Sequence, residues 1–322
     1  MRARYILPRF RIAVVGAGAI GGYYGAKLAY FGRDVHFLMR SDLRQVRRAG
    51  IRIRGKAENI HLAKVNAYAS TEEIGPCDLV LIALKATANE QLSPLLPPLM
   101  HERTMLLTLQ NGLGNEELLA AQFGEERVLG GLCFVCLNRT APGVIEEYGH
   151  GRVVLGEHTG YPQARTHDIA WEFKRCGVVC TVAENLGLER WRKLVWNIPF
   201  NGLSVVGGGL ATDAILADTS LRARTLGLMD ETIAGANRCG YPLPTAVALE
   251  QIKRTEKLGA YKPSTLIDFE AGRPLEIEAI WGEPLRRSTA AGAAMPELER
   301  LYAELKAIDA QLRERPAEAV AS

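Results

Sequence analysis

The apolar positions in the first half of the chain form short runs that alternate with helical patterns. The first four runs are RIAVVGAG from residue 11, DVHFLMR from residue 34, DLVLIALK from residue 78 and TMLLTLQNG from residue 104. RVVLGE and VVCTVAEN are later runs, and AIGGYYGAKLAYFG predicts a helix that ends at Gly32. Near-continuous runs of Val, Ile and Leu with helices between them indicate a parallel sheet that is covered on both faces.

The pattern changes after about residue 185, where strand signals almost disappear. Helical periodicity predicts long helices over residues 187–206, 219–239, 244–257, 263–292 and 296–315. An α/β half followed by an all-helical half indicates two domains with a cleft between them. We therefore expect an N-terminal Rossmann-type, doubly wound sheet in residues 1–184 and an all-helical substrate domain in residues 185–322.

Composition narrows the class of protein. The 322 residues are 48% hydrophobic and 23% charged, with a net charge of +3, which is ordinary for a soluble globular protein. The chain has no long block of Lys and Arg, so we expect no nucleic-acid partner, and no apolar run reaches the roughly 20 residues that span a membrane. The opening MRARYILPRF lacks the apolar core of a signal peptide and is interpreted as a short leader, and the polar tail RERPAEAVAS is expected to fray.

The six cysteines do not form a recognisable metal motif. Cys133 and Cys136 have C-x-x-C spacing within GGLCFVCL, but this segment predicts a strand, in which side chains three positions apart point to opposite faces. No second Cys/His pair with zinc spacing follows. We therefore expect no metal, reduced cysteines that pack as small hydrophobic side chains, and a cytoplasmic location.

A glycine-rich turn joins the first predicted strand to the first predicted helix. Gly16, Gly18 and Gly21 have G-x-G-x-x-G spacing, in which the glycines allow a tight turn, a close approach of the backbone to a pyrophosphate, and tight packing of helix on strand. The start of the helix then offers N–H groups and a partial positive charge to phosphates. The turn predicts a dinucleotide site formed by Gly16, Ala17, Gly18, Ala19, Ile20 and Gly21.

The end of the second strand bears on the choice between NAD and NADP. An acidic residue there would bind the ribose 2′-hydroxyl of NAD, but HFLMR places Arg40 at this position. A guanidinium can pair with a 2′-phosphate, which a carboxylate would repel. Asp42 lies two residues later, and we interpret it as the cap of the next helix, after Ser41. The sequence therefore predicts NADP as the cofactor.

Two further polar residues follow predicted strands, where open α/β sheets bind their ligands. Lys85 ends LVLIALK, and Asn111 ends LLTLQNG. Each has an ordinary alternative, because a lysine often reaches solvent after a buried strand and Asn-Gly is a common turn pair. Their common position at one edge of the sheet favours contact with the cofactor or the substrate.

The stretch LERWRKLVWNIPFN, residues 188–201, places a polar stripe on an apolar helix. Lys193, Asn197 and Asn201 recur at every fourth position, and four residues of an α-helix turn about 400°, so the three side chains share one face. The ordinary alternatives are a surface pair of Lys193 with Glu189 and local hydrogen bonds of the amides. Pro199 removes one backbone hydrogen bond and is expected to kink the helix. Because unpaired polar groups are costly to bury, the stripe is expected to face a polar substrate.

Together these residues resemble the ketopantoate reductase (2-dehydropantoate 2-reductase) family. The motifs that carry the resemblance occur in order from residue 11 to about residue 310: VVGAGAIGGYYGAKLA, LIALKA, LQNGLGNEE, ERWRKLVWNIPFNGLS and DFEAGRPLEIEAIWG. The resemblance implies NADPH-dependent reduction of a 2-oxo acid by a Rossmann domain and a helical domain similar to that of 6-phosphogluconate dehydrogenase. It also implies a catalytic lysine at Lys193, substrate-binding residues at Asn197, Asn201 and Ser264, and further cofactor and active-site residues at Lys85, Asn111 and Glu276.

The chain departs from the family pattern at two places. Thr265 follows Ser264 where a methionine is frequent, and a substrate-binding asparagine of some members falls near Ala211. The second departure touches the expected substrate pocket, so a different 2-oxo acid or related carbonyl compound stays an alternative substrate. A non-catalytic NADP(H) sensor is the alternative from another class, and Glu276 as a plain surface acid is the alternative for that residue. The long late helices are candidates for an apolar homodimer face.

Overall fold

The computed structural model describes residues 10–55 and 58–314, and these residues form two compact units. The first unit contains the described residues up to Gln110 together with Asn115–Leu186, and the second contains Asn111–Gly114 together with the described residues from Gly187 onward. The expected leader and the fraying tail fall almost wholly outside the described residues. Within the described part of the chain, no helix is both long and apolar enough to cross a membrane.

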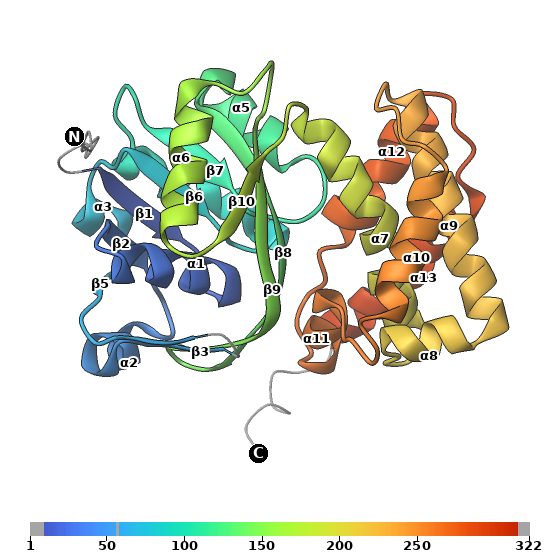
Figure 1. The fold of residues 1–322 in the computed structure, drawn as a ribbon, viewed down its shortest axis with the longest axis horizontal. Coiled ribbons are helices and arrows are strands. Elements are labelled where there is room, and N and C mark those ends of the chain that lie inside the picture. Colours follow the sequence, from blue (N-terminus) through green and yellow to red (C-terminus); the bar gives the residue numbers. More distant parts are fainter. Residues whose placement is uncertain (1–9, 56–57, 315–322) are drawn as a thin grey trace. The chain divides into compact units, whose positions relative to one another are not determined.

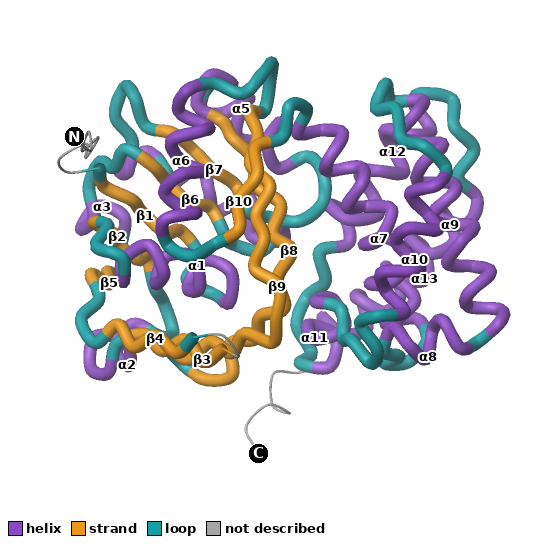
Figure 2. Tube along the Cα trace, viewed as in Figure 1, coloured by secondary structure: helices purple, strands orange, loops and turns teal. Residues whose placement is uncertain are grey.

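The first unit is built on one twisted sheet with helices around it (Figures 1 and 2). Its strands are β1 (Arg11–Val15), β2 (Asp34–Leu38), β3 (Ile51–Gly55), β4 (Asn59–Leu62), β5 (Asn66–Tyr68), β6 (Leu79–Ile82), β7 (Met105–Thr108), β8 (Val128–Ala141), β9 (Val144–Glu157) and β10 (Val179–Val182). The α-helices are α1 (Ala19–Tyr30), α2 (Leu43–Ala49), α3 (Thr71–Ile74), α4 (Leu92–Leu95), α5 (Asn115–Phe123) and α6 (Ala164–Arg175). Short 3₁₀ turns lie at Ala86–Gln91 (η1), Pro97–Leu99 (η2) and Glu125–Arg127 (η3).

The strand order confirms the predicted Rossmann-type sheet. Neighbouring strands follow the order β4-β3-β9-β8-β7-β6-β1-β2-β5, and β10 pairs with β9. The six neighbouring strands β8-β7-β6-β1-β2-β5 are all parallel, and β1 pairs with both β2 and β6. This is the 3-2-1-4-5-6 order of doubly wound nucleotide-binding domains, in which the order reverses next to β1. A ligand therefore has its expected place at the carboxyl ends of β1 and β6.

The sheet also contains antiparallel pairs, which the pattern of buried runs did not predict. The pairs β3–β4 and β8–β9 are antiparallel, and the β8–β9 hairpin consists of two strands of 14 residues each. The strands β3, β4 and β5 were not predicted from the sequence. Residues 51–54 of β3 alternate isoleucine with arginine and are alternately buried and exposed, so a period of two was present but very short.

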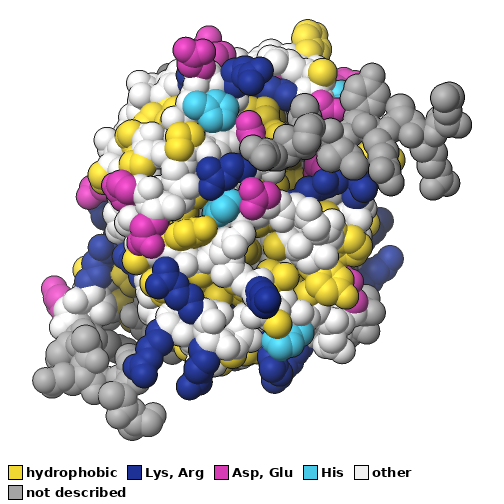
Figure 3. Space-filling model, turned by 90° about the vertical axis from the view of Figure 1, so that its left-hand side faces the viewer, with side chains coloured by type: hydrophobic (Ala, Val, Ile, Leu, Met, Phe, Trp, Pro, Cys, Tyr) yellow, Lys and Arg dark blue, Asp and Glu magenta, His cyan; other side chains and the backbone are white. Residues whose placement is uncertain are grey.

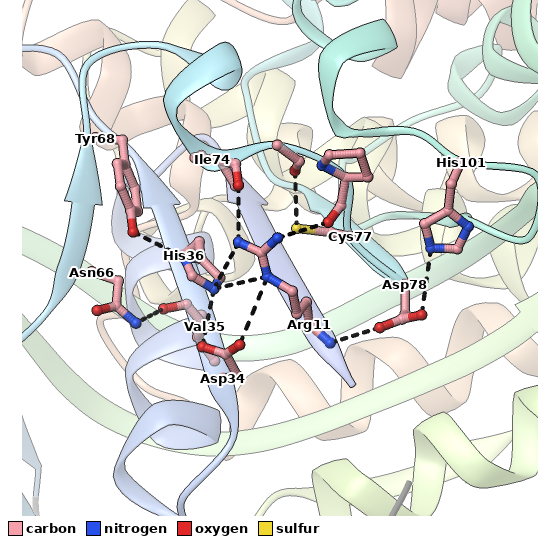
Figure 4. A network of polar contacts seen from close by, with 12 residues as sticks. Arg11, Asp34, Val35, His36, Asn66, Tyr68, Ile74, Cys77, Asp78 and His101 are labelled. Carbon is pink, nitrogen blue, oxygen red and sulfur yellow. Dashed lines mark hydrogen bonds and ion pairs between the residues drawn. The ribbon is translucent and has the colours of Figure 1, made fainter. Parts of the chain in front are cut away.

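A polar network joins the amino ends of β1, β2 and β6, opposite to the ligand edge (Figure 4). The guanidinium of Arg11 donates to the carbonyl oxygens of Ile74 and Pro76, at 2.9 and 3.0 Å, and lies 3.8 Å from the carboxylate of Asp34. Its backbone N–H donates to Asp78 at 2.8 Å. These bonds tie the first strand to the segment before β6, so the network is structural and holds the sheet together at the end away from the glycine turn.

The second unit is helical, as predicted. Its helices are α7 (Leu186–Val206, of which Leu186 lies in the first unit), α8 (Thr212–Ala217), α9 (Thr219–Arg238), α10 (Ala246–Glu256), α11 (Ser264–Glu270), α12 (Glu283–Ala290) and α13 (Pro296–Glu314). A π-helical turn, η4, covers Glu278–Gly282. The core of the unit includes fully buried side chains from α7, η4 and α13, among them Trp191, Phe200, Trp281 and Leu301.

The single helix that we predicted over residues 263–292 is wrong. The chain leaves the helical path after α11, at Gly272 with φ +63° and at Pro274, and becomes helical again only near Ile277. Glycine adopts a positive φ without strain, and proline supplies no N–H to a preceding turn. The backbone N–H of Leu275 instead donates to the buried carboxylate of Asp309 on α13, at 2.8 Å. The prediction failed because the apolar periodicity continues through residues 272–276, although a partner on α13 holds this segment in a non-helical conformation.

Candidate active site

The glycine turn after β1 has the close packing that its spacing predicts. Gly16 has φ +100°, and a Cβ there would lie 2.5 Å from the backbone nitrogen of Leu84. A Cβ on Gly21 would overlap the carbonyl oxygen of Gly16. At Gly18, by contrast, a Cβ would meet no atom within 4 Å. Two glycines are therefore required by packing within the protein, and Gly18 leaves room for the backbone to approach a ligand.

The helix that follows is suited to an anion. α1 begins at Ala19, its N-cap Gly18 provides no side-chain hydrogen bond, and its first turn contains no acidic residue. The first N–H groups of a helix have no acceptor inside it, and the helix dipole adds partial positive charge at that end. The residues from Gly16 to Gly21 therefore fit the pyrophosphate of a dinucleotide.

The two charged residues that follow β2, Arg40 and Asp42, differ in exposure and in pairing. Within the described residues the guanidinium of Arg40 has no hydrogen bond or ion pair, and its side chain is exposed. The side chain of Asp42 is 8% exposed and pairs with Arg139 of β8, with Arg139 Nη1 2.5 Å from Asp42 Oδ1. Asp42 does occupy the N-cap position of α2, but its carboxylate makes no capping hydrogen bond, contrary to our interpretation. Arg139 lies 97 positions away from Asp42, and no local pattern predicts it as the partner.

The surroundings of Arg40 are positively charged. Exposed arginines lie at positions 44, 47 and 48 on α2 and at positions 52 and 54 on β3. Figure 3 shows Lys and Arg side chains gathered toward the lower part of this face of the molecule, the end at which Figure 1 draws α2 and β3. Two of these arginines have acidic neighbours, Arg47 with Glu73 at 3.7 Å and Arg54 with Glu146 at 3.9 Å. The excess of arginine still favours an additional phosphate near the end of β2.

The carboxyl ends of β6 and β7 lead into polar segments. Lys85 is exposed and lies three residues beyond β6, at the N-cap of η1. After β7, Gln110 Nε2 donates to Asn89 Oδ1 at 2.7 Å, and Asn89 Nδ2 donates to Asn115 Oδ1 at 2.9 Å. These two hydrogen bonds link Gln110 and Asn115, the residues on either side of the segment Asn111–Gly114, through the side chain of Asn89. They were not predicted from the sequence.

The segment Asn111–Gly114 belongs to the second unit, where it contacts the helix with the polar stripe. Lys193 Nζ on α7 donates to Asn111 Oδ1 at 2.9 Å. Glu189, the ordinary surface partner considered for Lys193, instead lies 3.6 Å from Arg192. The structure therefore brings together two predicted site residues from different halves of the sequence, Lys193 and Asn111.

The π-helical turn η4 holds this segment in place. The backbone N–H of Leu113 donates to the carbonyl oxygen of Ala279 at 2.9 Å, and a Cβ on Gly112 would overlap that same carbonyl group. In a π-helix the carbonyl of residue 279 would accept from the N–H of residue 284, but residue 284 is Pro284. The carbonyl that Pro284 leaves without this partner accepts the bond from Leu113.

The two asparagines of the stripe are buried and have local contacts. Asn197 is 6% and Asn201 is 2% exposed. Asn201 Nδ2 donates to the carbonyl oxygen of Asn197 at 3.1 Å, and Asn201 Oδ1 accepts from the backbone N–H of Thr265 at 3.1 Å and from Ser264 Oγ at 3.5 Å. Asn201 thus brings α7 and the start of α11 together, as well as being a candidate for substrate binding. Ser264 is exposed.

Two further observations complete the helical part of the site. Glu276 is 5% exposed and directly precedes the helix that begins at Ile277, so it is not the surface acid considered as an alternative. α7 continues through Pro199, and the indole N–H of Trp281 donates to the carbonyl oxygen of Ile198 at 3.0 Å. Glu276 is therefore a buried acid, and Trp281 of η4 is bonded to the turn of α7 that precedes Pro199.

Three cysteines of the first unit, Cys77, Cys176 and Cys180, are buried. None of the six cysteines forms a disulfide, and Cys133 and Cys136 lie on β8. Burial raises the pKa of the Cys77 and Cys176 thiols to about 11 and that of Cys180 to about 12. Among the described residues, no group of three or more His, Cys, Asp or Glu side chains is arranged to hold a metal ion.

Comparison with known proteins gives consistent matches along the chain. The family description "Ketopantoate reductase PanE/ApbA" matches residues 12–160, and "Ketopantoate reductase PanE/ApbA C terminal" matches residues 185–309. A protein of Nostoc sp. named 2-dehydropantoate 2-reductase is 41% identical over 308 residues, covering 94% of this chain and 96% of the relative.

Solved structures show the same arrangement of elements. A 2-dehydropantoate 2-reductase from Geobacter metallireducens has a TM-score of 0.90 at 45% identity, covering 92% of this chain and 99% of that one. The fold also occurs in D-mandelate dehydrogenase, solved in a complex with NADH, at 22% identity, a TM-score of 0.84, and 94% and 99% coverage. At that identity the second likeness concerns the fold alone.

Proposed function

Because the chain belongs to the ketopantoate reductase family, we propose that it reduces 2-dehydropantoate to pantoate with NADPH. The observation that carries the proposal is the ammonium group of Lys193, which is held 2.9 Å from Asn111 Oδ1 on a helix whose apolar side chains are mostly buried. The reaction adds a hydride to the C2 carbonyl of a 2-oxo acid and a proton to its oxygen. A positioned ammonium group supplies both the proton and the stabilisation of the developing negative charge.

The proposed roles of the other residues follow from their chemistry. Asn197, Asn201 and Ser264 offer amide and hydroxyl groups that orient the carboxylate and hydroxyl groups of the substrate. Glu276 accepts a hydrogen bond from the substrate hydroxyl or favours the charged form of Lys193, because an acid near an ammonium stabilises its charge. Asn111 holds the ammonium in place through its side-chain oxygen.

The cofactor is proposed to bind to the first unit and to the active-site polar residues. Gly16, Ala17, Gly18, Ala19, Ile20 and Gly21 fit its pyrophosphate, and Arg40 fits a 2′-phosphate, with Lys85, Asn111 and Glu276 as further contacts. When bound, the reduced nicotinamide supplies the hydride. The fold alone does not choose the coenzyme, because D-mandelate dehydrogenase has this fold and was solved with NADH. The choice of NADP rests on the exposed Arg40 and on the pairing of Asp42 with Arg139.

The proposal is tested by the rate of NADPH oxidation with a panel of 2-oxo acids, with NADH in a parallel series. We expect 2-dehydropantoate to have the highest kcat/KM in the panel, and NADPH to be preferred over NADH. A clearly higher kcat/KM for another 2-oxo acid would support the alternative, a reductase of a different substrate. That alternative is suggested by Ala211, which stands near the position of a substrate-binding asparagine in some family members. No turnover with any carbonyl compound, together with tight NADPH binding, would favour the sensor. A cytoplasmic location and a homodimer belong to the same proposal, and light scattering on the purified protein tests the second.

A further inference from the structure

The carboxylate of Asp42 is fully engaged by the protein, although it lies at the end of β2. Its Oδ1 accepts from Arg139 Nη1 at 2.5 Å and from Ser41 Oγ at 2.9 Å. Its Oδ2 accepts from the backbone N–H of Gly143 at 3.1 Å. Arg139 and Gly143 lie at the tip of the β8–β9 hairpin, so a segment about a hundred positions later in the chain holds this carboxylate.

The hairpin tip has a fixed position next to α2. The carbonyl oxygen of Gly143 accepts from the backbone N–H of Arg52 on β3 at 2.8 Å. Gly143 has φ +73°, and a Cβ there would lie 2.8 Å from the carbonyl oxygen of Gly50, directly after α2. Arg139 is therefore presented to Asp42 by a strand whose following turn is fixed at Gly143.

As a result, the positive charge after β2 is exposed and the negative charge is neutralised within the protein. Arg40 is exposed and, within the described residues, has no ion pair, whereas Asp42 is buried and neutralised. Asp42 is the acid nearest in sequence to Arg40, and without Arg139 its carboxylate would lose its cationic partner. The carboxylate could then pair with the Arg40 guanidinium, repel a 2′-phosphate, or accept a hydrogen bond from a free ribose 2′-hydroxyl, as acids at the end of the second strand do.

We propose that Arg139 determines coenzyme specificity by positioning and neutralising Asp42, so that Arg40 stays available for the 2′-phosphate of NADPH. The inference rests on the proposed function, because it concerns the coenzyme of that reaction. Arg139 is a positioning residue, and its effect passes through Asp42. It predicts that loss of Arg139 weakens NADPH binding and spares NADH binding, and that simultaneous loss of the Asp42 charge reverses the effect.

The experiment compares Arg139→Met, Asp42→Asn and the double variant with the wild type. Dissociation constants for NADPH and NADH are measured from coenzyme fluorescence, and those of 2′,5′-ADP and ADP by calorimetry, so the readout does not depend on turnover. We expect Arg139→Met to raise the Kd of NADPH and of 2′,5′-ADP about tenfold or more, a free-energy difference of about 1.4 kcal/mol. The Kd of NADH should change much less, and the double variant should bind NADPH about as tightly as Asp42→Asn alone.

A double variant that binds NADPH as weakly as Arg139→Met would overturn the proposal, because Arg139 would then act on the phosphate directly. Unchanged NADPH binding in Arg139→Met would also overturn it. If the wild type itself binds NADH as tightly as NADPH, the proposed coenzyme fails instead, which separates the two failures. Arg139→Gln is the second variant if Arg139→Met does not fold, with the same expected direction.

A matched control is available in the same unit. Arg165 pairs with the buried carboxylate of Glu157, with Arg165 Nη2 2.5 Å from Glu157 Oε2. Arg165→Met removes a comparable pair at a position away from β2. It should lower the melting temperature without changing the ratio of the NADPH and NADH dissociation constants. An equal change of that ratio in Arg165→Met would show that the effect of Arg139 is merely structural, and this would overturn the proposal.

Discussion

Lys193 and Asn111 form a hydrogen bond of 2.9 Å although they are separated by 82 positions in the sequence. One is on the long helix α7, and the other is in a short segment between β7 and α5. The amide oxygen of Asn111 accepts from the ammonium group and so limits the directions in which Lys193 can point. In the role that we propose for Lys193, an acid that is held in this way loses less conformational freedom when its substrate binds.

Replacement of Lys193 is expected to abolish most of the activity. Lys193→Ala removes both the proton donor and the positive charge, so kcat should fall about 10³-fold or more while NADPH still binds. Steady-state kinetics and coenzyme fluorescence measure the two effects separately. Arg192→Ala, one residue earlier on α7 and with a side chain that is 44% exposed, is the control and should keep nearly all activity. Turnover close to the wild type in Lys193→Ala would remove the lysine from the mechanism.

The contact of Gly112 with η4 is expected to control catalysis more than stability. Gly112 has φ +86° and Gly114 has φ +91°, so alanine at either position is strained by about 1–2 kcal/mol. Only at Gly112 would the new Cβ overlap the carbonyl group of Ala279. Gly112→Ala should therefore displace Asn111 and lower kcat about tenfold or more, because small misplacements at a reacting centre are costly.

The control for this prediction lies in the same segment. A Cβ on Gly114 would first meet the side chain of Glu283 at 3.6 Å, which is an ordinary contact. Gly114→Ala should thus share the backbone strain and the loss of melting temperature but keep its kcat. Equal losses of kcat in both variants would mean that backbone strain, and not the contact with Ala279, causes the effect.

The Asp42 carboxylate is expected to stabilise the fold only above mildly acidic pH. Burial by itself raises the pKa of Asp42, but the hydrogen bonds from Arg139, Gly143 and Ser41 outweigh burial, and the pKa is lowered. A lowered folded-state pKa gives stabilisation that is present above the unfolded value, about 3.9, and is lost as the pH falls through the folded value. Asp42→Asn should therefore cost about 1–3 kcal/mol at pH 7, and the difference from the wild type should shrink below about pH 4.

Urea unfolding at a series of pH values measures this difference. Asp230→Asn, which replaces an exposed acid on α9, is the control and should show little change with pH. A difference between Asp42→Asn and the wild type that stays constant down to pH 3.5 would contradict the assigned pKa direction.

The buried thiols are expected to resist modification. At pH 8 a thiol whose pKa is about 11, as for Cys77 and Cys176, is ionised in only about one molecule in a thousand, and the thiolate is the reactive form. A thiol reagent should leave Cys77, Cys176 and Cys180 unmodified in the folded protein and should modify all six cysteines in urea. Mass spectrometry identifies the modified positions, and rapid labelling of Cys180 without denaturant would contradict the burial of this residue.

The local patterns of the sequence predicted the parts of the fold that local physics determines. The buried runs correspond to β1, β2, β6 and β7, and the glycine turn lies between β1 and α1. These features could be predicted because burial on both faces and turn geometry depend on residues that are close together in the sequence. The helical stripe likewise placed Lys193, Asn197 and Asn201 on α7.

Long-range contacts account for what the patterns did not predict. Nothing near Asp42 indicates Arg139, and nothing near Leu275 indicates Asp309, yet these partners decide the state of the carboxylate and the break after α11. The strand β3 was overlooked because its alternation is too short to identify alone, and its partners β4 and β9 supply the pairing. The mixed sheet could not be predicted for the same reason, since the direction of pairing is a property of two strands.

The membership of Asn111–Gly114 in the second unit has a consequence for dividing the protein. A gene cut at residue 186 would yield a first fragment that still carries these four residues, without the π-helical turn to which Leu113 donates. The second fragment would keep Lys193 but would lack Asn111. The first half, expressed alone, would therefore carry four residues that belong to the other unit, and the second half would be an incomplete compact unit. This enzyme cannot be divided into two complete modules without first moving a four-residue piece of chain.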